Sequence, residues 1–177
     1  MASSGPPTRA HERCSQCGFD GSRYDDPELL DAIRALIPQW QELLTSAGPE
    51  LRDRPQPEVW SAFEYAAHSR DITALHVFGV MAALQEDEPV VGDIGDDVIQ
   101  SAADAYGGEH LLDVQGGLTA ELAGLADRAA AAAPGAWSRG LIITGTRMDV
   151  RALLEHALHD STHHVADVER GLSQLRR

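Results

Sequence analysis

Hydrophobic residues recur along most of the chain at the three- and four-residue spacing of helices. One helical segment begins at Asp26-Pro27-Glu28, where an N-cap aspartate, a proline and a first-turn acid form a start signal. Others cover roughly residues 57–85, a region from about 96 to the alanine run before Pro134, and roughly 148–175. Residues 141–143 predict only a short extended piece. We therefore predict an all-α fold, an antiparallel four-helix bundle.

The first 25 residues lack this pattern and are polar and rich in glycine and proline. We expect an irregular arm over residues 1–25 and one bundle domain over 26–177, which is long enough to bury a sizeable core. Met1–Pro7 is polar with no apolar stretch after it, and no apolar run approaches the ~20 residues of a bilayer span. The sequence thus predicts a cytoplasmic protein whose two cysteines are thiols or metal ligands.

The formal net charge of −14 argues against nucleic acid and anionic membranes as partners, because both require a basic surface. All 14 cationic residues are arginines, so lysine Schiff-base chemistry is excluded. Small molecules are the expected partners. A homodimer is compatible with a bundle that has apolar residues on an outer face.

The last predicted helix contains half of the 8 histidines of the chain, at positions 156, 159, 163 and 164. At about 100° per residue, His164 falls roughly 50–60° and Asp160 roughly 90–100° from the centre of the apolar stripe, on the same side. His159 and His163 fall roughly 150–170° away, on the opposite face. The inward pair is therefore Asp160 and His164.

A fifth histidine, His68, lies inside the second helix on the face that carries Trp60, Phe63 and Ala67. A single helical histidine on an apolar face is most often a hydrogen-bonded core residue. Together with Asp160 and His164 on another helix, His68 predicts a divalent metal site. Three protein ligands leave open positions, as in catalytic sites. Zinc is the first choice, although nickel, iron and manganese suit the same ligands.

The string Trp60-Ser61-x-x-Glu64-x-x-x-His68, followed by histidines on the last helix, resembles the DinB-like (DinB/YfiT) superfamily of metal-binding four-helix bundles. The resemblance covers about residues 26–177. It places His68 at the first ligand position and His164 at the last. The middle position, which is commonly histidine, is Asp160 here; relatives that use mycothiol, such as maleylpyruvate isomerase, are similar in having a carboxylate there.

The resemblance implies a transferase or isomerase that uses a low-molecular-weight thiol such as mycothiol as cosubstrate. The metal would hold the thiol as a metal-bound thiolate, which attacks an electrophilic substrate. The arginine- and alanine-rich, lysine-free composition is typical of high-GC genomes, including those of actinobacteria. Two alternatives remain open: a non-catalytic zinc-binding stress or interaction protein, and a metal-dependent hydrolase.

Cys14-x-x-Cys17 in the arm is half of a structural zinc motif, and no βαβ pattern surrounds it to indicate a thioredoxin-like role. His11 could complete a local site. We favour a second metal site in which the outward pair His159 and His163 accepts the two thiolates and fixes the arm to the last helix. The alternative is an unanchored arm with two spare thiols.

Four further residues could orient the bundle ligands through hydrogen bonds to them. Glu64 and Asp71 flank His68, whereas His156 and Asp167 flank Asp160 and His164. For Glu64 and Asp71, a solvated face or a surface ion pair is an equally good interpretation.

Overall fold

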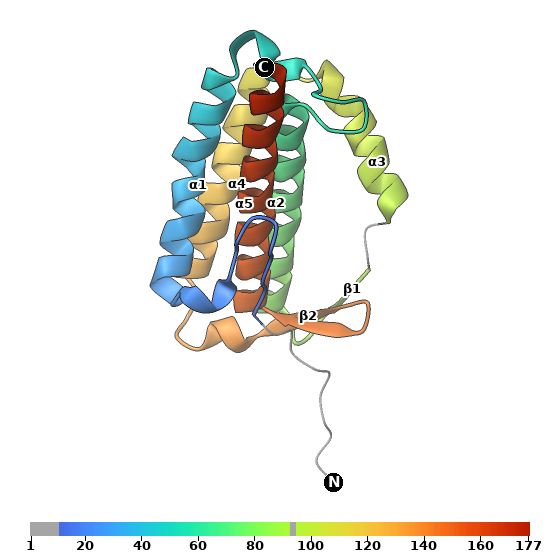
Figure 1. Cartoon of the computed structure of the whole chain (residues 1–177). Helices are drawn as coiled ribbons and strands as arrows, with labels where there is room; N and C mark the ends of the chain where they lie inside the picture. The colour runs from blue at the N-terminus through green and yellow to red at the C-terminus, as the bar shows by residue number, and fades with distance from the viewer. Residues whose placement is uncertain (1–10, 93–94) are drawn as a thin grey trace.

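Four long helices form the body of the molecule in the computed structural model, which describes residues 11–92 and 95–177. They are α1 (Asp26–Ser46), α2 (Ala62–Gln85), α4 (Leu111–Ala130) and α5 (Val150–Leu175). Figure 1 shows them side by side, with the C-terminus at the end of α5. The predicted four-helix bundle is confirmed.

The order of the helices differs from a simple antiparallel bundle. Helices α1 and α2 each pack mainly against α4 and α5 and so lie diagonally across the bundle. In Figure 1 α1 and α5 run upward, whereas α2 and α4 run downward, so the two neighbouring pairs α1/α5 and α2/α4 are parallel. The connection over residues 86–110 explains this, because it carries the chain from the end of α2 back to its start.

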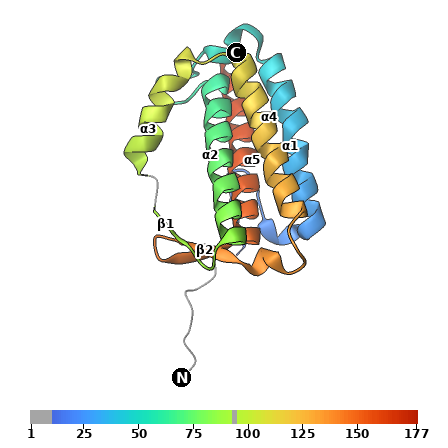
Figure 2. The same ribbon diagram turned by 180° about the vertical axis from the view of Figure 1, so that it is seen from behind.

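That connection and the one before α5 contain structure that the helical pattern did not predict. Helix α3 (Asp96–Ala105) lies beside α2 (Figure 2). Strands β1 (Val90–Val91), β2 (Gly140–Ile143) and β3 (Thr146–Asp149) form a sheet in that order, with β1 parallel and β3 antiparallel to β2. The all-α prediction is therefore wrong in this detail: residues 141–143 pair with two strands that are too short to show alternation.

Short 3-10 turns join these elements: η1 (Gly21–Arg23), η2 (Gly48–Arg52), η3 (Tyr106–Gly108) and η4 (Ala136–Ser138). Sequence-encoded caps define the starts of the long helices. Asp25 and Ser61 each form a capping box with the glutamate three residues later, and the Asp149 carboxylate accepts from the Ala152 N–H.

Within the described residues, none of the helices combines the length and hydrophobicity that a membrane span needs.

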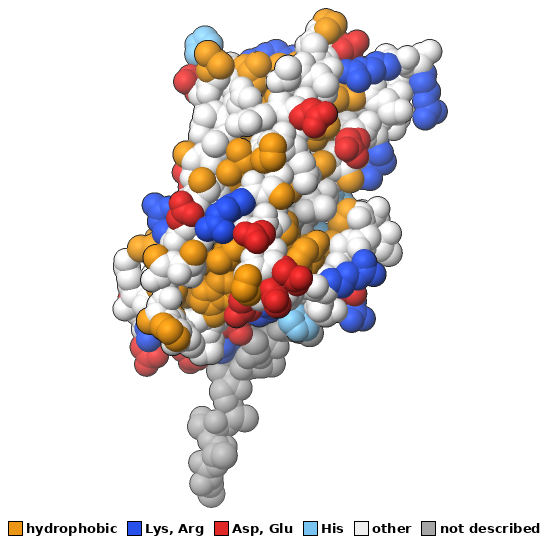
Figure 3. All heavy atoms as spheres, turned by 90° about the vertical axis from the view of Figure 1, so that its left-hand side faces the viewer, with side chains coloured by type: hydrophobic (Ala, Val, Ile, Leu, Met, Phe, Trp, Pro, Cys, Tyr) orange, Lys and Arg blue, Asp and Glu red, His pale blue; other side chains and the backbone are white. Residues whose placement is uncertain are grey.

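The core is built from aliphatic side chains around one buried tryptophan. The Trp40 indole N–H donates to the Ser161 hydroxyl at 2.8 Å, which links α1 to α5 inside the bundle. On the α1 side of the surface, acidic, basic and hydrophobic side chains are interspersed (Figure 3). Ion pairs there, such as Arg34 with Asp127 at 3.1 Å, are exposed. Exposed pairs contribute about 0–1 kcal/mol each, so the core carries most of the stability.

The arm lies along α5 (Figure 1). Its Phe19 ring is buried and stacks on the His159 ring, with the centroids 5.0 Å apart. Beneath the arm, the buried Glu155 carboxylate accepts from His11 Nδ1 at 2.8 Å and from the Glu12 N–H at 3.4 Å. A Cβ on Gly21 would lie 2.4 Å from the Glu155 carboxylate, so the missing side chain permits this close approach. The predicted arm was residues 1–25, of which 1–10 lie outside the described residues.

Candidate metal sites

The three residues predicted to face the bundle interior meet between α2 and α5. One potential ligand atom from each of His68, Asp160 and His164 lies within 4.8 Å of the others. The rings of His68 and His164 are 5.1 Å apart, and His164 Nε2 lies 3.5 Å from Asp160 Oδ1. All three residues are largely shielded from solvent. The arrangement can hold a divalent cation through two imidazoles and one carboxylate.

Carboxylates around His164 favour positive charge at this point. Burial alone would lower the pKa of His164, but its contacts with Asp160 and Asp167 outweigh burial and raise the pKa to about 9. Burial would raise the pKa of Asp160, but His164 beside it lowers that pKa to about 2. The local field thus stabilises a cation, which a proton or a metal ion can supply.

Aromatic rings enclose the two histidines. The ring centroid of Trp60 lies 4.9 Å from that of His68, and the ring centroid of Tyr65 lies 5.1 Å from that of His164. Burial, and then the neighbouring His164, lower the pKa of His68. His68 is therefore neutral at pH 7, which is the form that binds metals.

Of the four residues expected to orient the ligands, Asp167 is in position. Its Oδ2 accepts a hydrogen bond from His164 Nδ1 at 3.1 Å, which leaves Nε2 facing Asp160. Such a carboxylate fixes the ring and raises its basicity as a ligand. The same oxygen is 3.6 Å from Nε2 of the neighbouring His163.

The other three residues have different partners. Glu64 completes the capping box of α2, because it occupies the third position of the helix, where free N–H groups need an acceptor. Its carboxylate also pairs with Arg54. Asp71 accepts from Arg70 at 2.7 Å and from the Tyr106 hydroxyl. The interpretation of Glu64 as a residue that orients His68 is therefore not met, because its carboxylate binds Arg54 and Ser61.

His156, one turn before Asp160, donates from Nδ1 to a Glu12 carboxylate oxygen at 2.9 Å. It belongs to the contacts between α5 and the arm rather than to those of the bundle ligands.

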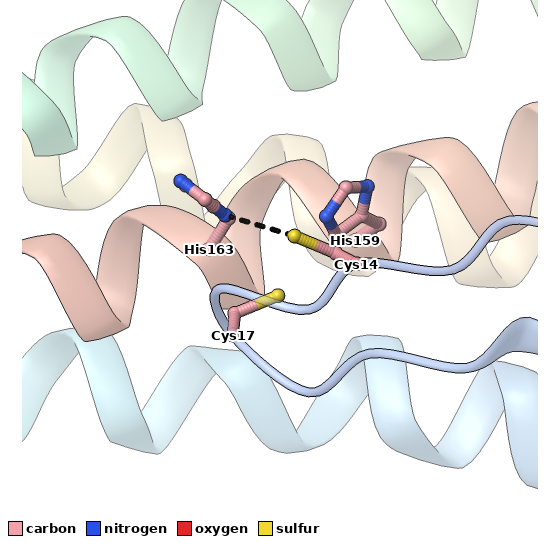
Figure 4. A group of neighbouring side chains, drawn as sticks. All are labelled: Cys14, Cys17, His159 and His163. Atoms are coloured by element: carbon pink, nitrogen blue, oxygen red, sulfur yellow. Dashed lines mark hydrogen bonds between the residues drawn. The ribbon is translucent and has the colours of Figure 1, made fainter.

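The arm brings its two thiols to the outward pair of histidines (Figure 4). One potential ligand atom from each of Cys14, Cys17, His159 and His163 lies within 4.8 Å of the others, and Cys14 Sγ is 3.7 Å from His163 Nδ1. Both nitrogens of His159 are buried and form no hydrogen bond within the described chain, although Nδ1 lies 3.0 Å from Glu12 Oε1. The structure thus brings the four residues of the predicted second site together, and metal binding there stays a prediction.

The backbone of the arm turns tightly between the cysteines. The Gly18 N–H donates to the Cys14 carbonyl at 3.0 Å, and Gly18 has a φ of +76°, which glycine adopts without strain. Backbone N–H groups of Cys17 and then Gln16 donate to the Cys14 sulfur and, with His159 and His163, lower its pKa to about 6. Burial raises the pKa of Cys17. His11 points away to Glu155, so the local site with His11 is not formed.

A solved structure with a similar arrangement of helices is that of YfiT from Bacillus subtilis, which is described as a probable metal-dependent hydrolase with an unusual four-helix bundle topology. The TM-score is 0.74 over 86% of this chain and 90% of YfiT, at 12% sequence identity. The chain has the YfiT fold. The resemblance to DinB-like bundles is thereby confirmed at the level of the fold. Neither family models nor curated proteins give a match.

Two residues near the sites of this YfiT-like bundle were missed from the sequence. His76 is buried, and its ring lies 5.2 Å from that of His156. Burial, and then His156, lower the pKa of His76 to about 4, so the ring is neutral at pH 7. His76 follows His68 by eight residues on the same face, so the helical spacing could have revealed it. Glu12 forms a further possible ligand group with His156 and His159, and only the folded arm brings it there.

An apolar pocket of about 680 Å³ opens beside these histidines, between α2, α5 and the small sheet. Side chains of α2 and of the strands form most of its wall, and the pocket is lined by Ile72, Leu75, His76, Phe78, Gly79, Val91, Gly92, Leu141, Ile143, Thr144, Thr146, Met148, Leu153 and His156. Phe78 at its rim is 60% exposed. A pocket of this size with few polar groups suits a small, largely apolar molecule.

Proposed function

We propose that this protein is a divalent-metal-dependent enzyme whose metal is held by His68, Asp160 and His164. The supporting observation is that the bundle site lies next to the apolar pocket. Ile72 lies one turn after His68 and His156 lies one turn before Asp160, and both line the pocket. The proposed ligands are therefore about one helical turn, or 5.4 Å, from its wall.

The residues present fit a catalytic metal better than a structural one. Three protein ligands leave coordination positions for a substrate group. A divalent metal held by these residues would lower the pKa of a bound thiol or water and so would supply a nucleophile at neutral pH. Asp167 holds the His164 ring so that Nε2 faces the site, while Trp60 and Tyr65 cover the two imidazoles.

We favour transfer of a low-molecular-weight thiol similar to mycothiol to an electrophile, or a thiol-dependent isomerisation. Two features support this choice. The sequence is similar to mycothiol-using relatives in having a carboxylate at the position of Asp160. The pocket wall suits an apolar electrophile. Zinc is our first choice of metal, and nickel, iron and manganese suit the same ligands.

Metal-dependent hydrolysis is the second candidate, and the fold match to YfiT favours it. The same three ligands and the same open positions would serve an activated water in place of a thiol.

The test combines metal loading with two assays. Protein loaded with each metal is incubated with mycothiol and a chromogenic electrophile, and separately with a chromogenic ester without thiol. We expect thiol-dependent product from the wild type and from the control His110→Ala, an exposed residue outside the site. We expect none from His164→Ala. Thiol-independent ester hydrolysis that His164→Ala abolishes would support the second candidate instead. Metal at the bundle site without either activity would favour the non-catalytic zinc-binding protein.

A further inference from the structure

We propose that Cys14, Cys17, His159 and His163 form a structural zinc site that fastens the arm to α5. This site is separate from the bundle site and does not depend on the proposed function. The ligands come from two segments distant in sequence, since Cys14 and His163 are 149 positions apart. Figure 4 shows the two thiols and the two imidazoles turned toward one another between the arm and the helix.

The four side chains lie close to the positions that a tetrahedral zinc ion requires. With Zn–S bonds of about 2.3 Å and Zn–N bonds of about 2.0–2.1 Å, neighbouring ligand atoms are roughly 3.3–3.8 Å apart. The contact between Cys14 Sγ and His163 Nδ1, at 3.7 Å, lies in this range, and the whole group lies within 4.8 Å. Shifts of about 1 Å in side-chain atoms would therefore close the site.

The unsatisfied ring of His159 is the second, independent observation. Neither of its two buried nitrogens forms a hydrogen bond within the described chain, and a metal bond would satisfy one of them. Its Nδ1 lies 3.0 Å from Glu12 Oε1, which leaves one nitrogen for the metal and one facing a carboxylate. Carboxylates commonly support histidine ligands of zinc in this way.

Contacts that need no metal already hold the arm in this place. Phe19 packs on His159, and the buried Glu155 accepts hydrogen bonds from His11 and the Glu12 N–H. The thiols are thus presented to α5 by the fold, which lowers the entropic cost of binding an ion. Four protein ligands, two of them thiolates, favour zinc in a closed structural site.

The experiment measures metal content and ligand type in the full chain. Purified wild type, Cys14→Ser, Cys17→Ser, His164→Ala and the arm control Ser15→Ala are analysed for zinc by mass spectrometry. The same proteins are reconstituted with Co²⁺, which gives a near-ultraviolet charge-transfer band only when a thiolate is bound. We expect His164→Ala and Ser15→Ala both to keep the zinc of this site and the full band. In both cysteine variants we expect the zinc of this site and most of the band to be lost.

A second measurement avoids variants that fold poorly. A mercurial thiol reagent added to folded wild type should release one zinc per chain as both thiols react. The proposal is overturned if wild type shows no charge-transfer band, or if blocking both thiols releases no zinc. These results concern the arm alone, because loss of the bundle metal would appear only as a difference between wild type and His164→Ala.

Discussion

Two groups of potential ligands share the same two turns of α5. They differ in the types of ligand, in the second segment that contributes ligands, and in whether coordination positions stay open for substrate. The bundle group joins Asp160 and His164 to His68 of α2, with two imidazoles and one carboxylate. The arm group joins His159 and His163 to the two cysteines, with two imidazoles and two thiols. Three hard or borderline ligands leave room for substrate, whereas four ligands with two thiolates close the coordination shell.

The comparison shows how one helix serves two sites with different chemistry. His163 and His164 are neighbours in sequence, but consecutive residues point about 100° apart around a helix. They therefore belong to different groups, and the second segment that reaches each face decides what the site can do. Asp167 lies between them, 3.1 Å from His164 Nδ1 and 3.6 Å from His163 Nε2.

The largest expected effect separates the two sites completely. His164→Ala should remove the metal of the bundle site and abolish the proposed activity, because only two ligands remain there. His163→Ala should instead remove the zinc of the arm and leave the bundle metal in place. Metal content per chain and turnover, measured on both variants, check this crossed pattern.

The two variants are matched, since each removes one imidazole from neighbouring positions of the same helix. Loss of the same metal from both would mean that the groups are not independent, and the comparison would fail.

The sequence predicted the facing of these histidines because α5 is long and regular, so angles counted from its apolar stripe stay accurate over several turns. The same reasoning failed for Glu64, where a local need of the helix start for acceptors decides the contacts of the side chain. Glu12 and the strand partners of β2 could not be predicted, since their contacts depend on where an irregular arm and short loops settle. The parallel helix pairs depend on the path of the 86–110 connection, which helical periodicity does not report.

The next effect tests whether the arm is a separable unit. Phe19→Ala should weaken docking of the arm by about 3 kcal/mol, because a buried ring that packs on His159 is removed. Tryptic cleavage after the exposed Arg13 should become faster, whereas the melting temperature of the bundle should change little. Phe78→Ala is the control, because Phe78 is 60% exposed on α2. A large fall in the melting temperature for Phe19→Ala alone would show that the arm is part of the cooperative core.

A smaller effect should appear at the carboxylate between the sites. Asp167→Asn should lower metal affinity at the bundle site about 10–100-fold, because the hydrogen bond that fixes His164 loses its charge. The arm site should change less, since its contact from Asp167 to His163 is longer. Competition with a chromogenic chelator measures both affinities. Glu169→Gln, on the exposed face nearby, is the control, and equal weakening of both sites would contradict the assignment of Asp167 to the bundle site.

The smallest effect tests whether the Glu64 carboxylate stabilises the start of α2 or supports a metal ligand. Burial alone would raise the pKa of Glu64, but hydrogen bonds from Arg54 and Ser61 outweigh it and lower the pKa below its ordinary value of 4.5. The folded state therefore gains stability above pH 4.5, and this gain is lost as the pH falls through the lowered pKa. Glu64→Gln should cost about 1 kcal/mol at pH 7 and less at acid pH, because glutamine keeps the cap but not the charge. Urea unfolding at several pH values measures this. Metal affinity at the bundle site should stay unchanged, since Glu64 caps the start of α2 and does not contact the metal ligands. A loss of metal in this variant would instead mean that Glu64 helps to orient His68.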